Sequence, residues 1–183
     1  FKAGLDDDLS GNGALFIADA TSASQIVHEY AQAPGGGEFE SFSEITNLNE
    51  QGQAAWQSDL RDTPDPKGIF RGSANGLTEI ARVNDPAPDA TGASDGVFSD
   101  FDGAVYVNND GEVIFKANIS GSATGFRGVF VGDGTSVTSI VREGDPAPDG
   151  NGSFSNPALY GINEQGQVLF TATLSGTAGG TDD

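Results

Sequence analysis

The feature of this sequence that most constrains its fold is an internal repeat of about 57 residues. One aromatic position recurs at steps of 55, 59 and 55 residues, and a second aromatic, a proline and a turn glycine follow a similar spacing. These landmarks are Phe1, Trp56, Phe115 and Phe170; Phe16, Phe70 and Phe130; Pro34, Pro88 and Pro148; and Gly52, Gly111 and Gly166. They predict one structural unit repeated along the chain. The expected boundaries are a partial copy at 1–37, whole copies at 38–94 and 95–152, and a partial copy at 153–183.

Each whole copy predicts four short antiparallel strands. Asparagine and glycine between the first two strands supply the positive φ that a tight hairpin needs. The second strand carries apolar residues such as Val113 and Phe115 at alternate positions. On the fourth strand Ile80 and Ile140 are expected in the core, and the alignment predicts a fourth strand, not a helix, for 22–30. In successive copies the expected first strands are 44–48, 103–107 and 158–162, the second 53–60, 112–119 and 167–174, the third 68–72 and 128–132, and the fourth 77–83 and 137–142.

A four-stranded meander that repeats in this way is typical of a β-propeller blade. Each sheet is apolar on both faces, so successive sheets must stack face to face. We therefore expect an all-β fold of about three four-stranded propeller-type blades, with a β-solenoid as the alternative. The second strand occurs four times, and the other strands three times each. Because closed propellers have about four to eight blades, we expect this one to be open or completed by another chain.

The composition excludes several classes of function. Lys and Arg number 8 against 27 Asp and Glu, and the resulting net charge of −19 repels nucleic acids. The absence of Cys excludes disulfide scaffolds, thiol nucleophiles and cysteine-based metal centres. No stretch approaches the roughly 18 apolar residues of a membrane span. The chain begins at Phe1 and not at Met, which favours a processed product or a piece of a longer protein.

Acidic loops that recur with the repeat are the candidate metal sites. Calcium takes six to eight oxygen ligands from flexible loops, and Asp, Asn and main-chain carbonyls supply such ligands here. The competing interpretation is turn chemistry, in which Asp and Pro shape the loops and keep the surface soluble. Calcium is the one cofactor that the sequence suggests. Its candidate ligands are Asp6, Asp8, Asp85, Asp89, Asp145 and Asp149.

The single histidine does not point to catalysis. His28 aligns with Arg82 and Arg142 at the end of the fourth strand, so we expect a polar residue with an exposed tip. The two arginines are expected to form surface ion pairs with nearby carboxylates such as Glu79 and Glu143, and such pairs stabilise little.

Other signs of enzyme or sugar chemistry are missing from the sequence. Trp56 stands where Phe115 and Phe170 stand in the other copies, so it is expected to pack in the core and not to stack on a sugar. No serine-nucleophile elbow, phosphate-binding loop or dinucleotide fingerprint occurs. We expect no enzyme and no catalytic residues.

The stretch GDPAPDGNGSFSNPALYGINEQGQVLFTATLSGTAGGTDD at 144–183 resembles a repeat of large secreted or cell-surface proteins from environmental bacteria, which often carry a carboxy-terminal sorting anchor. In those proteins the repeat continues into a strand like Gly68-Ile69-Phe70. The resemblance covers essentially the whole chain, although Gln32-Ala33-Pro34 replaces the Asp-Pro-Ala-Pro core in the first copy. It implies an exported, propeller-like adhesion or surface module without known catalytic residues.

These observations lead to one expected function and one alternative. The chain is expected to be a secreted, non-enzymatic structural or adhesive module, and more sharply a filament subunit joined head to tail with other copies by strand or blade complementation. The alternative is a glycan- or protein-binding propeller fragment of a larger surface protein. That alternative predicts a solvent-exposed aromatic residue away from the core positions of the repeat. Neither interpretation involves nucleic acid or a membrane span.

Overall fold

The computed structural model describes residues 13–178, and this part of the chain is all-β, with no helix. The fold is propeller-like and built of antiparallel sheets. The strands are β1 (Ala14–Ala18), β2 (Ala23–His28), β3 (Glu38–Phe39), β4 (Ala54–Arg61), β5 (Lys67–Ser73), β6 (Gly76–Arg82), β7 (Pro86–Pro88), β8 (Ser94–Phe101), β9 (Tyr106–Val107), β10 (Val113–Ser120), β11 (Arg127–Gly132), β12 (Val137–Arg142), β13 (Ser153–Ile162) and β14 (Val168–Ser175).

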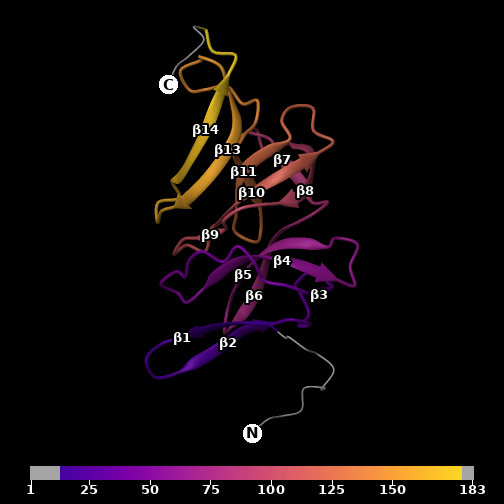
Figure 1. The fold of residues 1–183 in the computed structure, drawn as a ribbon, viewed down its shortest axis with the longest axis vertical. Helices are drawn as coiled ribbons and strands as arrows, with labels where there is room; N and C mark the ends of the chain where they lie inside the picture. The colour runs from indigo at the N-terminus through magenta and orange to yellow at the C-terminus, as the bar shows by residue number, and fades with distance from the viewer. Residues whose placement is uncertain (1–12, 179–183) are drawn as a thin grey trace.

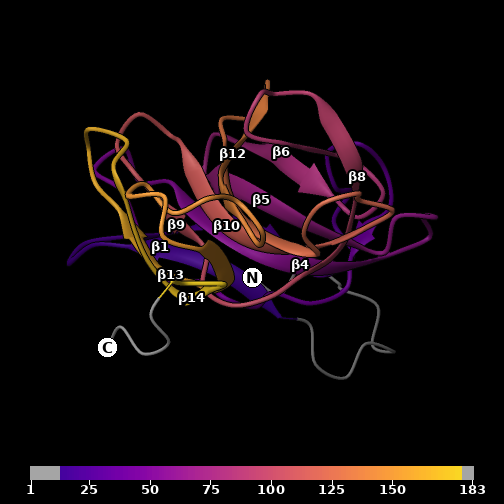
Figure 2. The ribbon, with the colours of Figure 1, turned by 90° about the horizontal axis from the view of Figure 1, so that it is seen from above.

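The described strands form four sheets, and β7, within the expected copy 38–94, pairs in the sheet of the following copy. Sheet 1 is β1–β2, sheet 2 is β3–β4–β5–β6, sheet 3 is β12–β11–β10–β8–β7 with β9 also on β10, and sheet 4 is β13–β14. The sheets follow one another along the long axis, so β1–β2 and β13–β14 lie at opposite ends (Figure 1). Seen from above, strands of successive sheets overlie one another, with β12 near β6 and β10 near β5 (Figure 2). The expected second strands at 53–60, 112–119 and 167–174 are confirmed, as are the expected third and fourth strands, including the strand at β2. The second strand expected at Phe1 lies outside the described residues.

The first strands of sheets 2, 3 and 4 begin earlier than the sequence predicted, and the strand is interrupted in sheets 2 and 3 but continuous in sheet 4, where it is β13. In sheet 3 it consists of β8 and β9, which pair with the two halves of β10. Gly103 lies in the gap with φ +76°, a left-handed conformation that leaves the regular ladder. Sheet 2 has a similar break at Glu44, where φ is 55°. The prediction of 158–162 is the second half of β13, whereas only Tyr106–Val107 of 103–107 is a strand and 44–48 holds only isolated bridges at Ile45 and Leu48.

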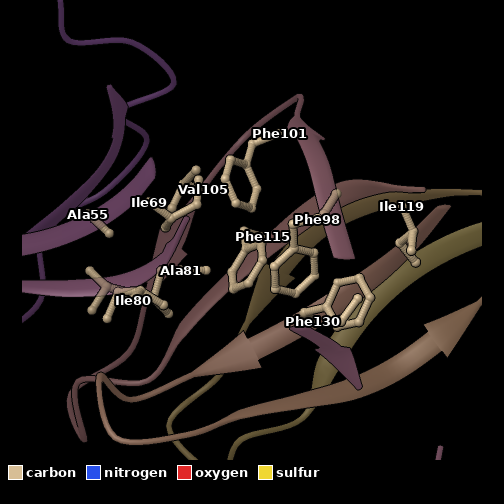
Figure 3. Close-up of a cluster of buried hydrophobic side chains, with 14 residues drawn as sticks. Ala55, Ile69, Ile80, Ala81, Phe98, Phe101, Val105, Phe115, Ile119 and Phe130 are labelled. Atoms are coloured by element: carbon tan, nitrogen blue, oxygen red, sulfur yellow. The ribbon is translucent and has the colours of Figure 1, made fainter. Parts of the chain in front are cut away.

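The core lies between the sheets and not within one of them. The aromatic residues of the second and third strands face the preceding sheet: Trp56 and Phe70 pack against Val27 of sheet 1, and Phe115 and Phe130 pack against sheet 2. Figure 3 shows rings of sheet 3 directed at small aliphatic side chains of sheet 2. The expected core position of Trp56 is confirmed, since its side chain is fully buried. Face-to-face burial explains why the second strands are apolar on both sides.

The prediction that Ile140 lies in the core is wrong, and its place in the stack of sheets explains why. Ile80 is buried, whereas Ile140 is 38% exposed. A Cβ added at Gly132, at the end of β11, would lie 2.8 Å from the Ile80 side chain, so the third strand of sheet 3 covers Ile80. The described residues of sheet 4 include a first and a second strand only. Ile140 is exposed because no third strand of sheet 4 lies over it.

Candidate interaction surface

An aromatic set of three rings recurs in the two larger sheets. The first strand, second strand and third strand contribute one ring each. The first-strand and third-strand rings stand edge to face at 4.9 Å in both sheets, and the second-strand and third-strand rings stack at 6.3 and 5.9 Å. The two sets are Phe39, Trp56 and Phe70 in sheet 2 and Phe98, Phe115 and Phe130 in sheet 3.

Sheet 4 contains only two rings of this set. Phe154 and Phe170 lie 5.7 Å apart at 74°, which matches the 5.8 Å and 74° of Phe98 and Phe115. Among the described residues β14 pairs only with β13, and none of them forms a third strand of this sheet. At the other end of the molecule β1 carries the third-strand aromatic, Phe16, which is 62% exposed. The ring that sheet 4 lacks is therefore exposed at the opposite end.

Other apolar side chains are exposed at the same two ends. On β14 Leu169 is 67% exposed, although the equivalent Ala55 and Ile114 are buried between sheets. Leu169 lines a groove of about 420 Å³ with Ile162 and Val168. A second groove, of about 340 Å³, separates sheet 1 from the first strand of sheet 2. Its apolar lining includes Phe16, Ile17, Ile26, Ile45 and Leu48.

An asparagine ladder connects the first turns of sheets 2, 3 and 4. Asn49 Nδ2 donates to the carbonyl of Asn108 at 2.8 Å, and Asn108 Nδ2 donates to the carbonyl of Asn163 at 3.3 Å. Each asparagine also accepts main-chain N–H groups of its own turn through Oδ1. Asn108 is buried, whereas Asn163 at the end of the ladder is exposed. The ladder fixes the stacking of successive sheets, and its last rung faces solvent.

The predicted calcium ligands lie in separate turns. Asp6 and Asp8 are outside the described residues. Asp85 and Asp145 each accept the main-chain N–H of the arginine three residues earlier, at 2.6 and 2.7 Å.

The remaining two predicted ligands also accept hydrogen bonds within their own turns. Asp89 accepts from Thr91, whose hydroxyl is the main reason that the pKa of Asp89 is lowered. Asp149 accepts the N–H of Asn151 at 3.0 Å. Within residues 13–178 no three His, Asp or Glu side chains gather as metal ligands would. Calcium binding stays a prediction, and the geometry of these four aspartates is that of turn formers.

The expected ion pair of Arg82 with Glu79 is confirmed, but the expected surface location of the two arginines is wrong. Arg82 and Arg142 are only 4% and 1% exposed. Arg82 does pair with Glu79, at 2.5 Å, but Arg142 pairs with Asp95, at 3.3 Å, and not with Glu143. The alignment of the repeats identified the two arginines as equivalent, but the sequence did not predict that they are buried.

Each arginine also donates to main-chain carbonyls of the loop that leads into its own sheet. Arg82 contacts the carbonyls of Pro34 and Gly36 at 2.5 and 2.7 Å, and Arg142 contacts those of Pro88 and Asp95 at 3.4 and 3.0 Å. His28, the equivalent residue of sheet 1, is exposed as predicted. The two arginines therefore act as buried clamps.

Comparison with known proteins places the chain in a family. No curated protein and no solved structure matches it. No helix in the part that the structure describes is long and apolar enough to cross a membrane. A family model matches residues 2–183, nearly the whole sequence. The chain therefore belongs to DUF7453, a family of unknown function.

Proposed function

We propose that the chain is a non-enzymatic structural and adhesive module of the cell exterior, and that copies of it join head to tail by completing one sheet between them. The observation that carries this proposal is the aromatic set divided between the two ends: sheet 4 holds two rings, and Phe16 is exposed on β1. In the join, β14 of one copy pairs with β1 of the next, as β4 pairs with β5 and β10 with β11. The likeness of the repeat to those of secreted bacterial surface proteins supports the exterior location.

The whole sheets define the register of this pairing. Both place the second-strand aromatic directly opposite the third-strand aromatic, so Phe170 lies opposite Phe16 of the next copy. Phe16 then packs beside Phe154 and Phe170 against sheet 3, and Leu169 packs against sheet 2 of the next copy. Sheet 1 already stacks on sheet 2 as sheet 2 stacks on sheet 3. The completed sheet therefore continues the stacking of the molecule without a change of geometry.

Two end variants test the proposal by light scattering. Phe16→Asp places a charge on the face of β1, and Leu169→Asp places one on the face of β14. The unmodified chain is expected to form particles heavier than 18.7 kDa, and each variant alone is expected to be a monomer. A mixture of the two variants retains one intact pair of ends, so it is expected to form dimers and nothing larger.

The control is Phe126→Asp, because Phe126 is 66% exposed, close to the 62% of Phe16, but lies in a loop away from both end faces. This variant should assemble like the unmodified chain. A chelator added to the assembled chain tests the calcium prediction, since dissociation would place calcium at the joins. A monomer of 18.7 kDa at every concentration, for the unmodified chain, would overturn the proposal.

One observation favours the alternative, a glycan- or protein-binding module. Phe126 lies outside the core positions of the repeat and is 66% exposed, as that alternative predicted. Such a ring offers a face for stacking on a sugar or a partner side chain. Binding of soluble oligosaccharides by the monomeric Phe16→Asp variant, lost on Phe126→Ala, would support it. Absence of binding in a glycan screen would leave assembly as the function.

A further inference from the structure

In sheets 2 and 3 the fourth strand contributes a buried arginine that donates hydrogen bonds. In both sheets the guanidinium reaches the carbonyl of the proline that precedes the first strand, Pro34 or Pro88. Carbonyl oxygens only accept hydrogen bonds, so a donor from the fourth strand is required at this point. Arg82 and Arg142 meet that requirement within the chain.

Sheet 4 has the same receiving loop. Asn151 Oδ1 accepts the N–H of Ala178 at 2.8 Å, as Asp95 Oδ1 accepts that of Ala123 at 2.9 Å. A Cβ added at Gly152 would lie 2.6 Å from the Ser175 carbonyl, and the equivalent distance in sheet 3 is 2.5 Å. Residues 151–152 of the loop therefore repeat the contacts of residues 95–96 in sheet 3, although Pro148 stands three residues before Asn151 and Pro88 stands seven residues before Asp95. The described part of sheet 4 has no fourth strand to bring a donor to it.

We propose that His28 of the next copy is the specificity-determining residue of the join and that it binds the Pro148 carbonyl as an imidazolium. This inference rests on the proposed head-to-tail function, which brings β2 of the next copy to the fourth position of sheet 4. His28 stands at the end of β2, in the place of Arg82 and Arg142. Its Nδ1 already lies 2.6 Å from the carbonyl oxygen of Glu29. Two carbonyl partners require a proton on both ring nitrogens, and only the protonated ring supplies them.

The charged groups that neighbour this position along the two chains are carboxylates, and one cation, Arg61, lies over the ring of Tyr30, 4.0 Å from its centroid. On its own chain the neighbouring carboxylate is that of Glu29, and the loop of the other copy carries Asp145 and Asp149. Asn151 replaces the Asp95 carboxylate, so the loop lacks the direct ion pair that Arg142 makes in sheet 3. The join is therefore held more weakly at this point than the internal sheets.

If His28 binds as an imidazolium, the affinity between the two copies should decrease as the pH rises. A group that binds only as a cation contributes only while it is protonated, so its contribution falls as the pH rises. The dissociation constant of the Phe16→Asp and Leu169→Asp heterodimer should thus increase between about pH 5.5 and pH 8, by at most about tenfold per pH unit for one proton.

The test measures that dissociation constant by sedimentation velocity. His28→Arg, placed on the Leu169→Asp chain whose β1 end forms the join, should bind tightly at every pH in this range. His28→Gln on the same chain should bind weakly, and its affinity should not depend on pH. Any pH dependence that remains in this variant measures the contribution of the carboxylates. His28→Arg on the Phe16→Asp chain is the matched control, because that end takes no part, and it should change nothing.

The outcomes separate this inference from the function on which it rests. If the heterodimer forms but its affinity is independent of pH, or if His28→Arg changes nothing on either chain, the role of His28 is wrong and head-to-tail joining stands. If no heterodimer forms at any pH, and the unmodified chain is a monomer, both are wrong.

Discussion

At the scale of single residues, Arg142 is the most constrained charge in the described part of the chain. Its guanidinium is buried among carbonyls and Asp95. Removing one partner of a buried pair leaves the other uncompensated. Arg142→Ala is expected to lower the free energy of unfolding by about 3 kcal/mol, measured by urea denaturation of the monomeric Phe16→Asp variant. Arg127→Ala, at an exposed arginine of β11, should change it by less than about 0.5 kcal/mol. Equal losses of unfolding free energy in the two variants would contradict the role of Arg142 as a buried clamp.

Asp95 gives the molecule a defined response to acid. The N–H of Ala123 and the hydroxyls of Ser122 and Thr124, with Arg142 next, lower the pKa of Asp95 from 3.8 to about 2. A lowered pKa means that the stabilisation is present above the unfolded value and is lost as the pH falls through the folded value. Unfolding should therefore become easier between about pH 4 and pH 2.

Asp95→Asn tests this response because it keeps an oxygen acceptor, as Asn151 does in the next copy, but cannot ionise. Thermal unfolding followed by circular dichroism is expected to show a smaller loss of stability between about pH 4 and pH 2 in this variant than in the parent chain. Parallel pH profiles for the two proteins would show that the Asp95 carboxylate does not contribute.

At the scale of strands and turns, the asparagine ladder connects the sheets. Asn108 is buried and bonded to both its own turn and the next one, so Asn108→Ala removes the partners of the Glu112 N–H and of the Asn163 carbonyl. The expected loss of unfolding free energy is about 2 kcal/mol. Asn163→Ala is the matched comparison: its position is exposed in the monomer, so the loss should be smaller, whereas assembly should weaken. A larger loss for Asn163 than for Asn108 would contradict this order.

The strand register of the proposed join is testable by cross-linking, because the chain contains no cysteine. Phe170 opposite Phe16 sets Leu169 opposite Ile17 of the next copy, on the same face. A mixture of Leu169→Cys and Ile17→Cys proteins is expected to form a disulfide-linked dimer on oxidation. Leu169→Cys with Phe16→Cys should not, since a shift of one residue directs the side chains to opposite faces. A gel without reductant distinguishes the two, and the reverse pattern would show a different register.

The sequence was sufficient for most of the strands but not for the contacts between sheets. Period and alternation predict the second, third and fourth strands because these depend on local hydrogen bonding and on which side chains are apolar. The burial of Arg82 and Arg142 depends on carbonyls that come from the loop before the first strand, about 50 residues away in the chain. The exposure of Ile140 depends on the neighbouring sheet. The local pattern of apolar and polar residues therefore predicts neither the burial of the arginines nor the exposure of Ile140.

At the scale of the whole molecule, two copies that join must overcome the repulsion between their negative net charges. Each copy carries a net charge of −19, and the repulsion between copies reaches about 30 Å at 10 mM salt but only about 8 Å at 150 mM. The apolar contacts of Phe16, Phe170 and Leu169 depend little on salt. Added salt should therefore strengthen the join, which is the opposite of what an interface held by ion pairs would show.

The heterodimer of Phe16→Asp and Leu169→Asp permits a direct measurement of this effect. Its dissociation constant at about 150 mM sodium chloride should be roughly tenfold lower than at about 10 mM, measured by sedimentation velocity at constant pH. Replacing two exposed acids outside β1 and β14, Asp62 and Asp110, by Asn should reduce the difference only slightly, because the repulsion is a property of the total charge. A join that weakens with salt would show that charge attraction, and not the divided aromatic set, holds the copies together.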